Sequence, residues 1–323
     1  MARMARGRFG FFFWPFDPDY TARMVGLGEA CGWDLVGVAD TPGNAMDVWV
    51  ALAVAAQRSA RVGLAACVTN LVTRHPAVTA GAAASIDQLA PGRLILGVGT
   101  GHSGVVNVGA GRSSPDDLRR GLTDLRDSLA RRPGARVPVY AAASGPAALR
   151  AAGAVADGVF VNYGLQREHV ARARSLIAEG AHQVGRNVDE IDLWWIACLD
   201  VAEEREATLE KLGSILAFVG AYVVGPAPER RDVPPALVEP VRELRRRYTT
   251  HRAGMDPGLT RELGVFDYLR ARLAVAGTPA DCVGQVRAAM AAGASQLMFT
   301  VSLAADPART VELFGAEVLP ALR

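Results

Sequence analysis

Short apolar runs alternate with amphipathic helical segments along most of this chain, and this alternation restricts the possible folds more than any other feature. Several helices begin with a polar residue followed by proline, as at Asp17-Pro18, Ser114-Pro115 and Thr278-Pro279. The polar side chain accepts a hydrogen bond from the first turn, and proline is tolerated there because an N–H at that position would have no partner within the helix. A regular exchange of strands and helices predicts a parallel sheet covered by helices.

The pattern predicts eight strands. They are expected at Phe9–Trp14, Leu35–Ala39, Val62–Val68, Leu94–Val98, Val137–Ala142, Gly158–Asn162, Ile191–Val201 and Gln296–Val301. Between about residues 224 and 265 the pattern loosens, and we expect a long loop with short helices there rather than a separate domain. Eight strands in 323 residues favour an α/β fold: a (β/α)8 TIM barrel forming one domain over residues 1–323, with an insertion before the last strand.

Composition argues against several classes of protein. The chain has 35 Lys and Arg against 33 Asp and Glu, a formal charge of +2, which is too balanced for a protein that neutralises many phosphates of a nucleic acid. Its 4 cysteines show no Cys-x-x-Cys spacing, so neither a disulfide framework nor a zinc site is predicted. The apolar run Phe9–Phe16 is too short for a leader, and no run of about 18 apolar residues indicates a membrane span. We expect a cytoplasmic protein that acts on a small molecule.

In a (β/α)8 barrel the residues that follow each strand form the active face. Polar or glycine residues stand at these positions: Asp40 and Thr41, Thr69 and Asn70, Gly99 to Ser103, Ser144 and Gly145, and Tyr163 with Gly164. The facing carboxylates that a glycosidase needs are missing from this set, as are the converging carboxylates or histidines that bind a divalent metal. No metal site is therefore predicted.

Three of these loops are rich in small residues and suit a phosphate group. Gly99-Thr100-Gly101, Ser144-Gly145 and Gly164 let main-chain N–H groups approach an anion closely, and a helix is expected to start at Pro146. A glycine motif after a strand can also be no more than a tight turn, and this alternative stays open. The presence of three such loops on one face favours a binding site.

Three titratable residues near strand ends each allow two interpretations. Asp40 can cap a helix or stabilise a turn, or it can contact a cofactor or substrate. His75 precedes Pro76 and is expected to help start a helix. His102 follows the glycine loop, where an imidazole can act as acid or base near neutral pH, although a hydrogen-bonded loop residue is the plainer alternative.

These motifs resemble the luciferase-like monooxygenase superfamily, specifically its deazaflavin-dependent branch around methylenetetrahydromethanopterin reductase. The matching segments are Thr69-Asn70, Thr73–Ala80, Ile86-Asp87, Gly92–Gly101, Ser103, Asn107–Gly109, Pro138–Pro146, Ala156–Gly158 and Gly277–Pro279. They span most of the chain in the family's order. The match is weakest from about Val224 to Phe266.

The resemblance implies a (β/α)8 barrel with a flavin-type ring at its mouth, and coenzyme F420 or, alternatively, FMN as the cofactor. It implies a non-proline cis peptide between Cys67 and Val68, in a bulge behind the ring. Thr69 and Asn70 would contact the ring edge, and Asp40 matches the family's acidic position after the second strand. The family habit, together with apolar outer helix stripes, implies a homodimer.

The resemblance also assigns the phosphate and tail of the cofactor to three loops. These loops are Gly99-Thr100-Gly101, Ser144-Gly145 and Asn162 to Gly164. Two positions near the substrate depart from the family pattern. His102 stands where relatives carry a carboxylate, and Thr41 stands where some deazaflavin enzymes carry histidine.

The sequence is thus interpreted as an F420-dependent oxidoreductase that transfers a hydride between reduced deazaflavin and an organic substrate, with reduction of a C=C or C=N bond expected. His102 is the first candidate for the proton donor and Asp40 the second. An FMN-dependent luciferase-like monooxygenase and a non-catalytic flavin-binding protein are the alternatives.

Overall fold

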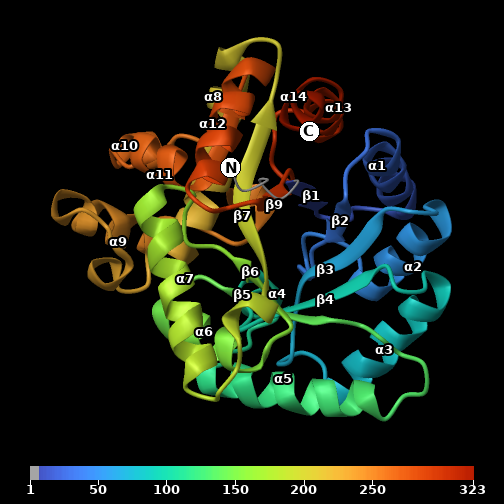
Figure 1. Ribbon diagram of the computed structural model, residues 1–323. Helices are drawn as coiled ribbons and strands as arrows, with labels where there is room; N and C mark the ends of the chain where they lie inside the picture. Colours follow the sequence, from blue (N-terminus) through green and yellow to red (C-terminus); the bar gives the residue numbers. More distant parts are fainter. Residues whose placement is uncertain (1–6) are drawn as a thin grey trace, which may run out of the picture.

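The computed structural model describes residues 7–323, apart from the side chains of residues 210 and 211, and it shows eight parallel strands closed into a barrel (Figure 1). The barrel strands are β1 (Arg8–Phe13), β2 (Leu35–Val38), β3 (Gly63–Asn70), β4 (Leu94–Gly99), β5 (Val139–Ala143), β6 (Gly158–Val161), β7 (Asp192–Val201) and β9 (Gln296–Thr300). Each strand pairs with its neighbour in this order, and β9 pairs with β1 to complete the ring. The predicted (β/α)8 TIM barrel is confirmed.

A ninth strand, β8 (Ala274–Gly277), was not predicted. β7 is 10 residues long, and its first residues, Asp192 to Trp195, pair with β6. Its last residues, Cys198 to Val201, extend beyond β6 and pair with β8, which therefore lies outside the closed ring. The four residues of β8 directly follow a helix and show no alternation of apolar and polar side chains that would predict a strand. The strand forms because β7 has an edge there that β6 does not cover.

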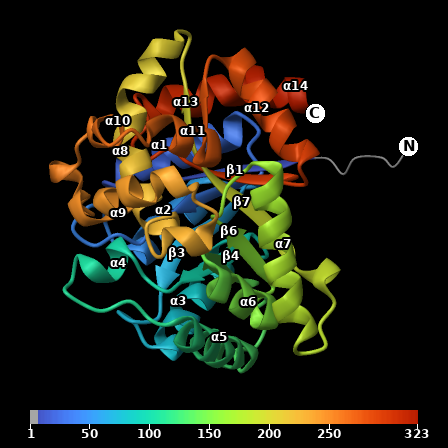
Figure 2. The ribbon, with the colours of Figure 1, turned by 90° about the vertical axis from the view of Figure 1, so that its left-hand side faces the viewer.

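Helices surround the barrel, as Figures 1 and 2 show. Those between the barrel strands are α1 (Pro18–Ala30), α2 (Val48–Arg58), α3 (Pro76–Leu89), α4 (Ser103–Val106), α5 (Pro115–Ala130), α6 (Pro146–Val155), α7 (Arg167–His182), η1 (Val188–Glu190) and α8 (Arg205–Val223). The Asp17, Ser114 and Thr278 side chains cap their helices as predicted. His75 also caps a helix, because its Nδ1 accepts a hydrogen bond from the N–H of Ala77 at 3.2 Å.

The segment that the sequence marks as irregular contains short helices that pack beside α8. They are η2 (Pro228–Arg231), η3 (Pro235–Leu237), α9 (Val238–Arg247), η4 (Arg252–Gly254) and α10 (Leu259–Glu262), followed by α11 (Phe266–Leu273). Figures 1 and 2 both place α9, α10 and α11 beside α8. After β8 come α12 (Pro279–Ala291) and, beyond β9, α13 (Pro307–Leu313), η5 (Phe314–Val318) and α14 (Leu319–Leu322). The last turns of α8 reach the mouth of the barrel, where Phe218 and Tyr222 line the cavity.

Apolar side chains form three buried clusters. The largest lies between the strands and the outer helices, and Trp195 belongs to it. The second fills the barrel and includes Trp194, so the two adjacent tryptophans face opposite sides of β7, as strand geometry requires. The third joins α8 to α9, α10 and α11, which fixes these helices relative to the end of β7.

Within residues 7–323, the structure contains no helix that is both long enough and apolar enough to cross a membrane. Residues 1–6, the start of the chain that a leader segment would include, lie outside the described residues.

Candidate functional site

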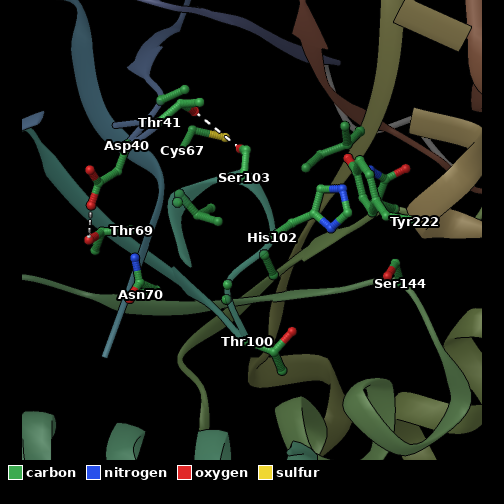
Figure 3. A pocket seen from close by; sticks show the side chains of 18 of the residues that line it. Asp40, Thr41, Cys67, Thr69, Asn70, Thr100, His102, Ser103, Ser144 and Tyr222 are labelled. Atoms are coloured by element: carbon green, nitrogen blue, oxygen red, sulfur yellow. Dashed lines mark hydrogen bonds between the residues drawn. The ribbon is translucent and has the colours of Figure 1, made fainter. Parts of the chain in front are cut away.

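A cavity opens at the carboxyl ends of the barrel strands (Figure 3). Its lining includes Asp40, Cys67, Val68, Thr69, Asn70, Gly99, Thr100, Gly101, His102, Ser144 and Asn162, all of them proposed from the sequence. They come from five consecutive strands, β2 to β6, or the loops that follow them, and parallel strands in a barrel bring these ends to one face. Alternation of strands and helices is therefore sufficient to predict that these residues meet.

The strand β3 forms one wall of the cavity with its backbone. The peptide between Cys67 and Val68 is cis, as the resemblance implies. The pairing of β3 with β4 shifts register between Ala66 and Thr69, which is the predicted bulge. On the neighbouring strand β4, a Cβ atom on Gly99 would lie 3.2 Å from Cγ2 of Val68 and 3.6 Å from Cβ of Ala142. A side chain at Gly99 would narrow the cavity, so the glycine keeps this space open.

Asp40 and Thr69 meet at one side of the cavity. The Thr69 hydroxyl donates a hydrogen bond of 2.7 Å to Oδ2 of Asp40, and Arg74 approaches the same oxygen at 3.2 Å. Arg74 also pairs with Asp47, the residue that caps α2. Burial raises the pKa of Asp40, while the Thr69 hydrogen bond and the Arg74 charge act in the opposite direction. These contacts make Asp40 an anchor for the Thr69 side chain as well as part of the cavity wall.

His102 lies on the other side of the cavity among aromatic rings. Its imidazole is 4.8 Å from the ring of Tyr222 and 5.5 Å from that of Phe218, measured between ring centroids. Its Nε2 lies 3.0 Å from the hydroxyl of Tyr248. Burial, assisted by the charges of Arg112 and Arg245, lowers the pKa of His102 to about 3. The sequence analysis assumed an imidazole that titrates near neutral pH, whereas the folded protein holds a neutral one.

Two buried polar atoms at the cavity lack a partner among the described residues. One is Nδ1 of His102 and the other is Oδ1 of Asn162, whose amide nitrogen donates to the hydroxyl of Tyr222 at 2.7 Å. Buried polar atoms are normally satisfied, so these two indicate where a bound molecule would supply hydrogen-bonding groups. The open space at Gly99 and these two atoms together fit a planar heteroaromatic ring.

Arginine side chains lie beside two of the three small-residue loops that were predicted to hold a phosphate. Arg112 donates to the carbonyl oxygen of Gly101 at 2.7 Å and to the hydroxyl of Thr100 at 3.2 Å. Arg231 donates to the carbonyl oxygens of Ser144 and Val223. No ion pair with a carboxylate is formed by either guanidinium among the described residues.

Arg231 lies at the N-terminus of α6, where the helix dipole is positive. A Cβ atom on Gly145, the residue before α6, would lie 2.5 Å from Nη2 of Arg231. No side chain caps this helix end. A cation beside the positive end of a 10-residue helix is unfavourable unless an anion joins them, so this end of the cavity is suited to a phosphate or carboxylate.

Two residues of the predicted set do not line the cavity. Gly145 lies under Arg231, and Gly164 lies against Arg272 and His169. Gly164 has a φ of +130°, which glycine adopts without strain and which lets the chain turn after β6. Its observed contacts are therefore those of a turn.

Sequence reasoning missed the groups that approach the cavity from outside the barrel strands. Tyr222 lies on the last turn of α8, and Tyr248 follows α9. Arg112 and Arg231 lie in loop and short-helix segments without a periodic pattern. No motif in these segments indicates proximity to the glycine loop.

The described residues contain no group of three or more His, Cys, Asp or Glu side chains that could hold a metal ion. The polar side chains that line the cavity are instead mainly hydroxyls, amides, an imidazole and a guanidinium, with Asp40 as the carboxylate among them.

Comparison with known proteins shows what this chain is similar to. Residues 4–130 and 124–296 match the model of the luciferase-like monooxygenase family. The chain is 27% identical to 5,10-methylenetetrahydromethanopterin reductase of Methanolobus tindarius, covering 96% of this chain and 99% of the relative. It is also 27% identical to the F420-dependent glucose-6-phosphate dehydrogenase of Nakamurella multipartita, with 95% and 94% of the two chains covered.

Solved structures agree with the fold. The F420-dependent tetrahydromethanopterin reductase of Methanopyrus kandleri superposes with a TM-score of 0.78 at 23% identity, covering 99% of this chain and 100% of the other. An F420-dependent secondary alcohol dehydrogenase gives a TM-score of 0.77 at 18% identity, with 99% and 100% covered.

Proposed function

This chain belongs to the luciferase-like monooxygenase family and is an enzyme, and from that membership we propose that it is an oxidoreductase that uses coenzyme F420. The relatives that match over nearly their whole length include F420-dependent enzymes. The observation that carries the proposal is the cavity itself. One end is lined by Cys67 and Val68 at the bulge of β3, and the other end, near Ser144, is basic.

In this proposal, different residues of the cavity contact the ring and the phosphate of the cofactor. Thr69 and Asn70 would contact the ring, and Gly99 would leave room for it. Arg112 and Arg231, together with the N-terminus of α6, would hold the phosphate. Reduced F420, when bound, supplies a hydride.

The organic substrate lies beside His102 in this proposal, and a C=C or C=N bond is reduced. The protein orients the substrate, excludes water with the aromatic side chains of Phe218 and Tyr222, and provides a proton for the atom that does not receive the hydride. His102 is the first candidate to hold that proton, at Nδ1, because this atom is buried and has no partner among the described residues. Asp40 is the second candidate, although Thr69 and Arg74 already engage one of its oxygens.

Titration of the purified protein with F420 and with FMN, side by side, tests this function. We expect F420 to bind more tightly. A clear preference for FMN would instead favour the FMN-dependent monooxygenase. Binding of F420 without turnover of any reducible substrate would favour a non-catalytic flavin-binding protein.

We propose further that two copies of the chain associate through α2 and α3. These helices pack beside each other and carry exposed apolar side chains, among them Val50 at 52% and Val78 at 60% exposure. A second copy would cover this surface. Light scattering at micromolar concentration should give twice the chain mass, and Val78→Glu should reduce it to the monomer mass.

A further inference from the structure

One pair of side chains connects the glycine loop after β4 to the segment outside the barrel. Tyr248 is the residue at the C-terminal end of α9, where its N–H donates to the carbonyl oxygen of Leu244 at 3.0 Å. Its hydroxyl reaches across to Nε2 of His102 at 3.0 Å, and the two rings are nearly parallel, with an interplanar angle of 8°. The contact is therefore a directed hydrogen bond between two rings held in fixed positions.

The other nitrogen of His102 is on the opposite side of the ring from this hydrogen bond. Nδ1 is buried and has no hydrogen-bond partner among the described residues. Figure 3 shows the imidazole between Ser103 and Tyr222, above Thr100 and Ser144 of the cavity lining. When a hydroxyl donates to Nε2 of a neutral imidazole, the proton of the ring must lie on Nδ1. With Tyr248 as the donor, the pair places an N–H group at this buried position without a partner among the described residues.

We propose that Tyr248 and His102 form a two-residue proton relay, in which His102 gives its Nδ1 proton to the substrate and accepts the Tyr248 hydroxyl proton at Nε2. The inference rests on the proposed function, because it deepens the role of His102 in that reaction. Tyr248 is a further residue of the proton path, and it acts on the substrate only through His102.

The relay balances atoms and charge. The hydride carries two electrons to one atom of the double bond, and the neighbouring atom forms a bond to the proton as the Nδ1–H bond breaks. At the same time the Tyr248 O–H bond breaks and an Nε2–H bond forms, so His102 stays neutral throughout. The resulting phenolate lies near the positive charges of Arg245 and Arg112 and recovers its proton from water, since Tyr248 is only half-buried.

The surroundings of the pair keep both groups in the protonation states that a relay requires. Arg112 from the loop before α5 and Arg245 from α9 act with burial to lower the pKa of His102 to about 3, and α8 adds only the neutral rings of Phe218 and Tyr222. Burial raises the pKa of Tyr248, against the opposing effect of the two arginines. An imidazolium is thus not the donor at neutral pH, whereas a neutral imidazole that is reprotonated as it donates remains able to act.

Nitrogen-15 NMR of the histidine side chains tests the relay without cofactor or substrate. The signals of His102 are assigned by their absence in the His102→Gln variant. In the wild-type protein, we expect His102 to be the neutral Nδ1–H tautomer at all pH values between 5 and 8. In Tyr248→Phe, which retains the ring but removes the donor, the Nε2–H tautomer should gain population. Either an Nε2–H tautomer in the wild type or an unchanged tautomer in Tyr248→Phe would overturn the proposal.

Kinetics of the enzyme loaded with F420 provide the second readout. Tyr248→Phe should lower kcat by about 10²-fold, in the usual range for loss of acid catalysis, with the dissociation constant of F420 unchanged. The solvent deuterium isotope effect on kcat should increase, because proton transfer becomes slower than hydride transfer. Tyr20→Phe is the matched control: it removes the hydroxyl of a half-buried tyrosine on α1 that packs against Phe13 and Phe16.

The two readouts separate the relay from the proposed function. If F420 fails to bind, the proposed function is wrong, and the NMR result still decides whether the Tyr248–His102 hydrogen bond sets the tautomer. If F420 binds and turnover occurs, but Tyr248→Phe retains the wild-type kcat and isotope effect, the enzyme is what we propose and the relay is wrong.

Discussion

Tyr248 and His102 are 146 positions apart in the chain, yet the hydroxyl of one lies 3.0 Å from Nε2 of the other. The contact exists because the insertion before β8 folds back over the mouth of the barrel and packs on α8. Its Tyr248, together with Phe218 and Tyr222 of α8, surrounds His102 with aromatic rings, and burial there leaves the imidazole neutral. The insertion therefore contributes directly to the chemistry of the cavity that the barrel strands form.

His102→Ala should lower turnover by about 10²-fold or more and leave F420 affinity nearly unchanged, because acid catalysis is commonly worth about 10² to 10⁴ and other loops hold the cofactor. The pKa of His102 is lowered to about 3, so its charge appears only below that pH. The profile of kcat against pH should accordingly show no rise or fall caused by the titration of His102 between pH 5 and 8. Full turnover in the variant, or a loss of activity that follows weaker F420 binding, would contradict the role of His102 as a proton donor.

Gly99→Val should weaken F420 binding at least tenfold, because the new side chain would extend between Val68 and Ala142 into the space that the ring requires. Fluorescence titration measures the affinity. Gly284→Val is a matched control on the exposed face of α12, where a Cβ atom would have no neighbour within 4 Å. Valine also has a better helix propensity than glycine, so this control should remain folded and bind normally. Equal affinities for the two variants would place the ring elsewhere.

Arg231→Met should weaken binding of F420 by about 10- to 100-fold, the usual worth of a hydrogen bond to a charged group. The same change should have little effect on the deazaflavin core that lacks the phosphate and tail, because Arg231 lies at Ser144 and the start of α6. Isothermal titration with both ligands gives the comparison. A similar loss for both would mean that Arg231 supports the fold of the cavity and does not bind the anion.

Asp192→Asn should destabilise the fold without affecting the cavity, because Asp192 begins β7 at the opposite end of the barrel. Its carboxylate accepts hydrogen bonds from Arg8 at 2.7 Å, the Tyr140 hydroxyl at 2.5 Å and Nε1 of Trp194 at 3.2 Å, and also from Gln296. The free energy of unfolding should fall by about 2 kcal/mol, as expected when partly buried donors lose a charged partner. Urea unfolding measures this change, and F420 affinity should stay at the wild-type value.

The effect of Asp192→Asn should also depend on pH. Burial acts to raise the pKa of Asp192, but hydrogen bonds from Tyr140 and Gln296 and the charge of Arg8 outweigh it, so the pKa is lowered. A lowered native pKa means that the ionised group stabilises the fold fully above the unfolded pKa, near about 4, and that this stabilisation is lost as pH falls through the native value. The difference between wild type and variant should therefore shrink below about pH 4. The exposed Asp189→Asn serves as the control, with an expected change within about 0.5 kcal/mol.

Local sequence patterns were sufficient to predict the barrel. Eight barrel strands and most of the cavity lining are predicted correctly from the polar-proline pairs, the alternation of strands and helices, and the glycine loops. These features depend on hydrogen bonds and periodicity within about 20 residues of the chain. Parallel strands then necessarily bring their carboxyl ends together. The cis peptide at Cys67-Val68 followed from the family resemblance and is present in the structure.

Tertiary structure alone decided what surrounds that lining. β8 forms only because β7 extends past β6. Tyr222 lines the cavity, and Tyr248 and Arg231 contact the lining residues His102 and Ser144, from helices whose positions no local pattern encodes. The sequence identified His102 by its place after a glycine loop and by the ordinary titration range of an imidazole. Its neutrality arises from burial and from charges contributed by distant segments, since desolvation and Coulomb interactions depend on distance in space and not on separation along the chain.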